Sequence, residues 1–292
     1  MNEKTYLPDV MYANNTTKEK LLTANQNNTV QPVALMRLGV FVPKPTKSQI
    51  KNPTVDASEL FSNLAIARAE GYDNIEITGP RLDMDTDFKV WVGVIQSFSK
   101  YGLKTNTIDL KFSEFAKYCG FPSKRLDKGL RKTISASLVR LRAKTVSFMK
   151  GKDDAMKGYA TGLLKTARFD AEIDRVVLEA DENLWELFQF DHRVLLQQHA
   201  IKALPKKEAA QAIYTFIESL PAKPAPVSFA RLRERLSLMS EVKEQNRTIK
   251  KALEQLQNIG YLDCKVEKKG RENYIIIYKR NPNLKPSDLG ID

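Results

Sequence analysis

Residues 228–277 constrain the fold of this chain more than any other stretch. Their pattern predicts a short helix, a turn, a longer basic helix over residues 241–259, and a hairpin with a lysine-rich tip. Ser228 is the predicted N-cap of the short helix. This order is typical of a winged helix-turn-helix, which places one helix in the DNA major groove and the hairpin on the adjacent backbone. We therefore expect this stretch to bind DNA.

The composition is compatible with a DNA-binding protein. The chain has 292 residues, enough for one large or two ordinary domains, and a net charge of +12. A basic chain need not bind an acidic polymer, so the placement of the charge matters more. Cys119 and Cys264 form no CxxC pair, which favours free thiols in a reducing cytoplasm. The chain shows no signal peptide and no apolar run long enough to span a membrane.

The first half of the chain repeats the element order of residues 228–277. Residues 83–99 form a predicted amphipathic helix that carries Trp91 as a core anchor, and Ser123 is the predicted N-cap of a helix over residues 124–144. The other expected elements are strands at residues 30–42, 74–78, 107–111, 145–149, 159–168 and 174–179, and helices at 56–70, 113–120, 193–203 and 206–219.

The predicted fold class is α+β, with two tandem winged-helix domains and a flexible polar N-terminal arm. The expected division is an arm over residues 1–28, an N-terminal domain over 29–180, a C-terminal domain over 181–280 and a polar tail over 281–292. We expect the N-terminal domain to bind the DNA backbone. The C-terminal domain is expected to read the DNA sequence.

The basic helix over residues 241–259 supplies the predicted base contacts. Val242, Ile249 and Leu253 belong to its expected packing stripe, and most of its polar residues lie off that stripe. Arginine pairs with guanine, and asparagine or glutamine with adenine. The predicted base-contacting residues are Gln245, Asn246, Arg247 and Lys250, and the predicted backbone contacts of this half are Ser228, Arg231, Arg233, Lys251, Lys268, Lys269 and Arg271. A solvated, charge-balanced helix face is the alternative.

A second basic stripe lies on the helix over residues 124–144. Its cations recur at spacings of three and four residues, so they share one helical face. No Asn or Gln accompanies them, which favours phosphate contacts over base contacts. The predicted backbone-contacting residues of this half are Lys124, Arg125, Lys128, Arg131 and Lys132. A solvated basic face is again the alternative. In the short helix, Arg231, Arg233 and Arg235 cannot share one face, so at least one of them is expected to be structural.

The sequence gives little support to catalysis. Asp83, Asp85 and Asp87 resemble the start of a calcium loop, but the glycine and the final glutamate of such a loop are missing. No phosphate-binding GxxxxGK[ST] motif is present. His192 and His199 do not form the His-x-His pair of rolling-circle nickases. We therefore expect no enzymatic activity, no metal and no cofactor.

Several longer stretches together resemble one family. They are residues 27–43, 77–89, 204–221, 229–238 and 244–264. These stretches resemble the RepA initiators of iteron-regulated plasmids, of the kind found in prophage plasmids and RepFIB replicons. The resemblance extends over about residues 27–285.

The resemblance implies a cytoplasmic protein that binds directly repeated sites, the iterons, in double-stranded plasmid origin DNA. Such initiators promote opening of the origin, recruit the host replication initiator and helicase, repress their own promoter and limit copy number. They form inactive homodimers and are active as monomers, with host chaperones assisting the conversion. The resemblance also implies that the C-terminal winged helix makes the main base contacts, and that the N-terminal one serves dimerisation and clamps the adjacent DNA backbone.

Three alternatives remain at this level. A winged-helix transcriptional repressor without initiation activity shares the DNA-binding elements. A nicking initiator enzyme requires the missing histidine pair. A scaffold that does not bind DNA would show no salt-dependent binding to origin fragments.

Overall fold

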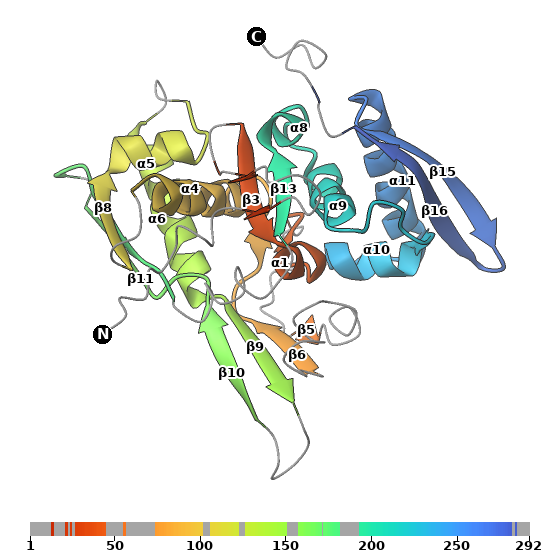
Figure 1. Ribbon diagram of the computed structural model, residues 1–292, viewed down its shortest axis with the longest axis horizontal. Coiled ribbons are helices and arrows are strands. Elements are labelled where there is room, and N and C mark those ends of the chain that lie inside the picture. Colours follow the sequence, from red (N-terminus) through yellow and green to blue (C-terminus); the bar gives the residue numbers. More distant parts are fainter. Residues whose placement is uncertain are drawn as a thin grey trace.

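The structure is a computed structural model that describes residues 13–14, 21–22, 24, 27–44, 55–56, 74–101, 106–122, 126–150, 157–170, 172–181, 193–281 and 284. Two three-stranded antiparallel sheets lie at opposite ends of the molecule, with helices between them (Figure 1). The predicted flexible arm, the helix at residues 56–70 and the polar tail lie largely or wholly outside the described residues. Within the arm, β1 (Ala13–Asn14) pairs with β2 (Leu21–Leu22).

The first half of the structure consists of three helices and a three-stranded sheet. In chain order the elements are α4 (Asp87–Tyr101), β8 (Thr107–Lys111), α5 (Phe112–Tyr118), α6 (Lys128–Ala143), β11 (Thr166–Asp170) and β12 (Arg175–Glu179). The sheet has the order β11-β12-β8, so the last strand lies in the middle and pairs with the first.

The second half has the same order of elements. They are α9 (Glu208–Glu218), β14 (Val227–Ser228), α10 (Phe229–Leu236), α11 (Val242–Asn258), β15 (Leu262–Lys269) and β16 (Glu272–Arg280). Its sheet has the order β14-β16-β15, again with the last strand between the other two. The two halves are therefore built from one topology, helix–strand–helix–helix–strand–strand.

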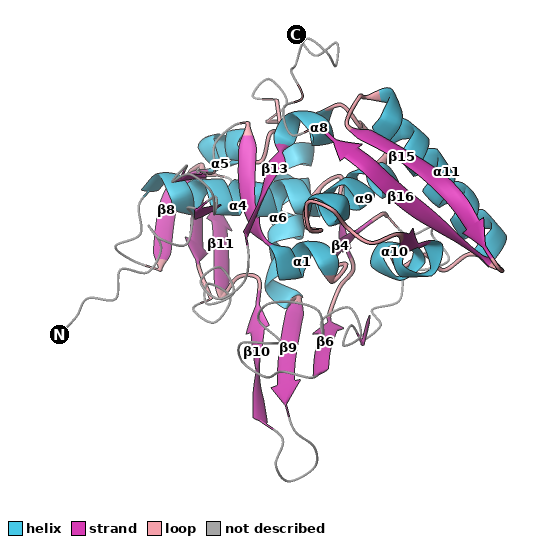
Figure 2. Ribbon diagram, turned by 45° about the vertical axis from the view of Figure 1, so that its right-hand side comes forward, coloured by secondary structure: helices cyan, strands magenta, loops and turns pink. Residues whose placement is uncertain are grey.

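A hairpin distinguishes the first half from the second. Strands β9 (Thr145–Lys150) and β10 (Lys157–Gly162) are inserted between α6 and β11. They extend a four-stranded sheet of order β10-β9-β6-β5, to which β6 (Asn74–Thr78) and β5 (Val55–Asp56) contribute. Figure 2 shows this hairpin projecting away from the helices.

Short elements join the two halves. Strand β3 (Asn28–Pro32) pairs with β13 (Arg193–Gln197), and β4 (Phe41–Val42) pairs in parallel with β7 (Leu82–Asp83). Helix α1 (Val33–Arg37) contacts α9, and α8 (Gln198–Lys202) precedes α9. The β3–β13 pair joins a strand of the predicted N-terminal domain to a strand of the predicted C-terminal domain. The domain boundary at residue 180 therefore stays a prediction.

One continuous hydrophobic core runs through both halves. Trp91 is fully buried, as predicted, and its Nε1 donates a hydrogen bond of 2.8 Å to Oε1 of Gln31. Burial of an indole N–H requires such a partner. The bond fixes β3 against α4, so the joining elements belong to the core.

Several predicted boundaries were wrong. Residues 30–42 form no single strand, because α1 interrupts them between β3 and β4. Residues 193–203 form β13 and then α8 instead of one helix. Residues 159–168 belong to two strands, β10 and β11. The strands at 74–78 and 107–111 are confirmed.

Two helices start later than predicted because aspartates cap them. Helix α6 begins at Lys128, and Oδ1 of its N-cap Asp127 accepts a hydrogen bond of 2.7 Å from Leu130 N. Helix α4 begins at Asp87, and Oδ1 of Asp83 accepts a hydrogen bond of 2.6 Å from Thr86 N. The Asp127 carboxylate thus satisfies one of the free amides in the first turn of α6, and the Asp83 carboxylate satisfies an amide of the turn that leads into α4.

Candidate DNA-binding surface

Helix α11 has one buried face and one basic face. Ile249, Leu253 and Leu256 are buried against the core, while α11 contacts α9 and α10. The cations lie on the opposite side, since residues 100° apart along a helix separate into faces. The exposed cations of α11 are Lys243, Arg247, Lys250 and Lys251. Arg247, Lys250 and Lys251 are therefore exposed, and their contact with DNA stays a prediction.

Arg247 lies near the centre of the exposed face. Its side chain is 79% exposed, and its Nη2 lies 2.7 Å from Oε2 of Glu244, one turn earlier on α11. An exposed ion pair of this kind contributes little to stability. Glu244 therefore holds the guanidinium only weakly on the open face. A guanine or a phosphate group can replace Glu244 as its partner.

Asn246 is held by a residue from the neighbouring helix. Nη1 of Arg233 on α10 donates a hydrogen bond of 2.8 Å to Oδ1 of Asn246, and Nη2 of Arg233 donates one of 2.7 Å to Oε2 of Glu272 on β16. The hydrogen bond from Arg233 lowers the pKa of Glu272 below its usual value. Arg233 was predicted to contact the DNA backbone. It is instead half-buried and joins α10, α11 and the hairpin.

Two further predictions for α11 need correction. Gln245 was predicted to contact bases, but it is buried, and its Nε2 donates to the carbonyl oxygens of Leu238 and Ser240. These bonds close the turn before α11, so the amide is not presented to DNA. Val242 was predicted to pack in the core, but it is 57% exposed because it stands at the first position of the helix.

Helix α10 uses its arginines mainly for packing. Ser228 is the N-cap, as predicted, and its hydroxyl accepts a hydrogen bond of 3.2 Å from Arg231 N. The guanidinium of Arg231 lies 5.3 Å from the centre of the Phe216 ring, and burial lowers its pKa. Neither the occupied Ser228 hydroxyl nor the half-buried Arg231 is a freely exposed phosphate ligand.

The tip of the β15–β16 hairpin is exposed and basic. Lys268, Lys269 and Arg271 surround Gly270, which adopts a positive φ of 64° in the turn. The ammonium of Lys269 lies 5.9 Å from the ring centre of Tyr274. The hairpin extends away from the helices (Figure 1). Its tip carries three exposed cations around the glycine turn, as the sequence predicted.

Helix α6 retains only part of its predicted stripe. Lys128 and Lys132 are exposed, whereas Lys124 and Arg125 lie outside the described residues. Nη1 of Arg131 lies 2.8 Å from Oδ1 of Asp174 at the β11–β12 turn. Its guanidinium also lies 5.0 Å from the ring centre of Phe112. Arg131, a predicted backbone contact, is therefore engaged within the fold.

A buried carboxylate that sequence reasoning missed joins α4 to α6. Asp87 is fully buried, and its Oδ1 accepts hydrogen bonds of 2.6 Å from Ser137 Oγ and 2.7 Å from Arg140 Nη2. The hydrogen bond and charge of Asp87 raise the pKa of Arg140 despite its burial. All three aspartates of the series therefore have structural roles. Asp83 accepts from Thr86 N, Asp85 pairs with Lys44 and Lys89, and Asp87 forms this network.

Two arginines lie where the halves meet. Sequence reasoning missed Arg81 and named Arg235 only as one of three candidates for a structural role. Arg235 is fully buried on α10, and its guanidinium donates to Met36 O at 2.6 Å, Phe41 O at 2.9 Å and Thr215 Oγ1 at 3.1 Å. Arg81 donates to Pro43 O, Leu236 O and Ser237 O. Arg235 is thus the structural arginine that the sequence required on α10.

Catalytic and membrane features are limited in the described part of the chain. His199 is half-buried on α8, while His192 lies outside the described residues. Within the described ranges, no group of three His, Cys, Asp or Glu side chains has the geometry to hold a metal ion. No described helix is both long and apolar enough to cross a bilayer. Cys119 is buried and Cys264 is half-buried.

Comparison with known proteins gives the class. Residues 87–218, from the start of α4 to the end of α9, match the family described as "Initiator Replication protein, WH1". The fold also resembles a crystal structure of domains 2 and 3 of RctB, with a TM-score of 0.53 at 13% identity, over 86% of this chain and 98% of that one. This resemblance concerns the fold alone. A mixed α and β fold with an initiator winged-helix domain defines a DNA-binding replication initiator.

Close relatives give the family within that class. "Replication protein RepA" of Escherichia coli is 67% identical over 285 residues, which cover 98% of this chain and 99% of the relative. "RepFIB replication protein A" of Salmonella typhi is 53% identical over 272 residues, which cover 91% and 84%. The chain belongs to the RepA family of plasmid replication initiators.

Proposed function

We propose that the chain consists of two tandem winged-helix domains that bind one origin DNA together. The observation that carries the proposal is the shared topology of the two halves, in which α6 and α11 occupy the same place. In a winged helix this place belongs to the recognition helix. Exposed cations on α6, α11 and the β15–β16 tip support contact with phosphates.

The two domains have different parts in this proposal. Helix α11 reads bases through Arg247, Asn246 and Lys250. Arginine matches the guanine edge, and Asn246 donates to a base from Nδ2 while Arg233 holds its Oδ1. Helix α6 binds backbone through Lys128 and Lys132, since its exposed face carries lysines and no amide side chain. Two sites on one chain meet successive major grooves about one helical turn apart. The repeated origin sites are the iterons.

The regulatory part of the proposal extends beyond DNA binding. The protein promotes origin opening without acting as an enzyme, and recruits the host replication initiator and helicase. A homodimer is the inactive form, and host chaperones assist its conversion to an active monomer. Binding near its own gene represses the promoter and limits copy number. The N-terminal domain contributes the dimer contact. The protein acts in the cytoplasm and needs no cofactor.

A replication assay separates an initiator from a repressor. The DNA flanking the gene is cloned into a plasmid that lacks any other functional origin, and the chain is supplied from a second plasmid. The wild-type chain is expected to maintain the test plasmid, and Asn246→Ala/Arg247→Ala is expected to lose it. A wild-type chain that silences a promoter reporter but maintains no plasmid would identify a repressor. Relaxation of supercoiled origin DNA by the purified chain would identify a nicking enzyme.

A further inference from the structure

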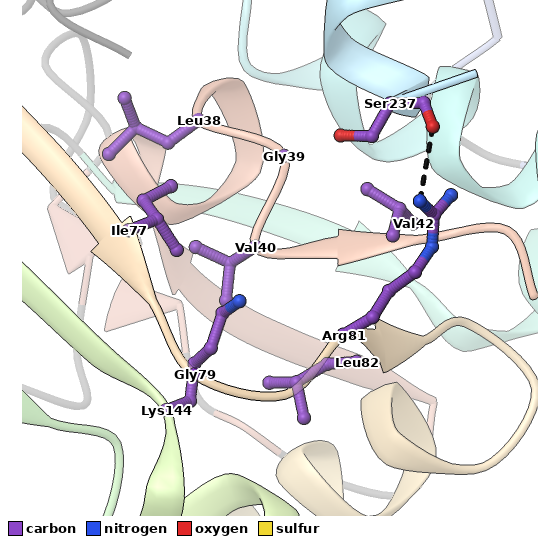
Figure 3. A pocket seen from close by; sticks show the side chains of 10 residues that line it. All are labelled: Leu38, Gly39, Val40, Val42, Ile77, Gly79, Arg81, Leu82, Lys144 and Ser237. Carbon is purple, nitrogen blue, oxygen red and sulfur yellow. Dashed lines mark hydrogen bonds between the residues drawn. The ribbon is translucent and has the colours of Figure 1, made fainter. Parts of the chain in front are cut away.

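A cavity of about 40 Å³ lies where the two halves meet (Figure 3). It is partly open to solvent, and its volume accommodates roughly three water molecules. Its walls come from the segment between α1 and β4, the region between β6 and β7, and the end of α10. The lining residues used below are Val40, Ile77, Arg81, Leu82, Lys144 and Ser237.

Lys144 places a positive charge in this cavity. It is the C-cap of α6, is 6% exposed, and points its ammonium group toward the cavity in Figure 3. The ammonium makes no hydrogen bond or ion pair with any described residue. Removal of an ammonium from water is costly unless a counter-ion compensates it.

The one other charged side chain that lines the cavity is also a cation. Arg81 already donates to Pro43 O and Ser237 O, and these bonds fix its position. None of the ten lining residues is acidic. Burial and the charge of Arg81 lower the pKa of Lys144 to about 8, so at pH 7 the ammonium is still mostly protonated. Two positive groups therefore face a cavity without a counter-ion among its described walls.

We propose that this cavity binds a small tetrahedral oxyanion of the phosphate type, with Lys144 as its main ligand. The anion accepts a hydrogen bond from Lys144 and is attracted by Arg81. The hydroxyl of Ser237, which donates a long hydrogen bond of 3.5 Å to Glu234 O, can turn to donate to the anion as well. Val40, Ile77 and Leu82 exclude water from one side of the ion pair and so strengthen it.

Occupancy of the cavity stabilises the junction of the halves. Lys144 directly precedes β9, and Arg81 lies between β6 and β7, so both belong to the first half. Ser237 is the C-cap of α10 in the second half. Ser237 adopts a left-handed φ of 47° and begins the turn that leads to α11. An anion held by both halves therefore favours the observed position of the turn before the recognition helix.

Thermal unfolding in low millimolar sodium phosphate or sodium sulfate, against sodium chloride of equal ionic strength, tests the site. For wild type we expect either oxyanion to raise Tm by roughly 2–4 °C at tenfold excess over its Kd. Lys144→Met is expected to abolish this rise, and Lys111→Met, at an exposed lysine of β8, to retain it. An equal rise in the Lys144→Met variant, or no rise in wild type, would overturn the proposal.

The pH dependence of sulfate binding gives a second measurement if Lys144→Met does not fold. Sulfate stays doubly charged, so a change in affinity reports the protein. Arg81 is the other titratable group facing Lys144 from the lining residues and stays charged. Wild-type affinity is expected to fall as the pH rises above about 8, in line with the pKa of Lys144. A flat profile would exclude Lys144 as the ligand.

Competition with DNA distinguishes the source of the anion. If a free anion occupies the site, sulfate raises Tm equally in the presence and absence of origin DNA. If a DNA phosphate occupies it, the sulfate effect disappears in the complex and Lys144→Met weakens DNA binding. Both results support the oxyanion site and assign its natural ligand. Absence of the sulfate effect under both conditions contradicts it.

Discussion

Arg233 on α10 donates a hydrogen bond of 2.8 Å to Oδ1 of Asn246 on α11. This bond assigns the acceptor side of the Asn246 amide to the protein and leaves Nδ2 to donate outward. Glu272 on β16 holds the other end of the same guanidinium, at 2.7 Å. Helices α10 and α11 and the β15–β16 hairpin are thus coupled through one arginine.

Arg233→Met is expected to lower both stability and sequence preference. It leaves Asn246 free to rotate and leaves Glu272 without its cation, which raises the pKa of that carboxyl toward its ordinary value. The folded-state pKa of Glu272 is depressed in wild type, so its contribution is present at neutral pH and is lost as pH falls through that value. Acid unfolding curves should therefore converge for wild type and variant at low pH. Curves that stay parallel would contradict the coupling.

Arg247→Ala is expected to weaken binding to the cognate repeat by about 1–3 kcal/mol and to leave random DNA almost unaffected. The reason is that its guanidinium is largely exposed among the other cations of α11. Fluorescence anisotropy with cognate and scrambled duplexes measures both affinities. Arg271→Ala at the hairpin tip is the matched control and should weaken both duplexes alike. A uniform loss for Arg247→Ala would make it a phosphate contact.

Two neighbouring cations of α6 are expected to behave differently. Lys128→Ala removes an exposed charge and should reduce the slope of log affinity against log salt by about one unit. Arg131→Ala breaks the pair with Asp174 and should lower Tm, with a smaller change in slope. Salt titrations of DNA binding and thermal melts check the pair. An unchanged slope for Lys128→Ala would place the α6 face in solvent.

Val242 is expected to contact a thymine methyl group. It is an exposed apolar side chain at the first position of α11, and such residues pack against the C5-methyl of thymine. Replacement of that thymine by uracil should cost about 0.8 kcal/mol with wild type. The cost should shrink with Val242→Ala. If uracil is tolerated at every thymine of the repeat, Val242 makes no such contact.

Lys144 is expected to make the free energy of unfolding depend on pH in the alkaline range. Its pKa in the folded chain is about 8, below the ordinary lysine value of 10.5. Between these values the unfolded chain binds more protons, so wild-type stability rises with pH there. Lys144→Met lacks this rise, which is at most roughly 3 kcal/mol. Denaturant unfolding of both chains in anion-free buffer at several pH values measures the difference. Identical pH profiles would contradict the buried ammonium.

The sequence was most informative where a pattern is local. Helix α11 was predicted within one residue at each end, because its apolar period and its flanking residues agree. The hairpin tip was predicted from Gly270, which lies between cations and adopts the positive φ of a turn. The contacts of individual residues were harder to predict. Gln245 and Arg233 were expected to contact DNA, as Arg247 was, but their neighbours in the fold engage them within the protein.

Long-range contacts explain the remaining errors. Residues 30–42 have the composition of a strand, yet α1 forms there because it packs on α9, far away in the chain. Arg235 and Asp87 have their partners 199 and 53 residues away. The hydrophobic period of a helix or strand does not indicate a hydrogen-bond partner that lies so far away in the chain. The three arginines of α10 gave the one available signal, since they cannot share a face.

Footprinting on the DNA that flanks the gene tests the central claim most directly. A chain with two DNA-binding domains and one base-reading helix should protect a series of direct repeats, each covering two successive major grooves on one side of the duplex. The series should persist for Lys128→Ala at low salt and vanish for Asn246→Ala/Arg247→Ala. A single protected inverted repeat, or protection without repeats, would contradict the account of an initiator that grips repeated origin sites with both halves.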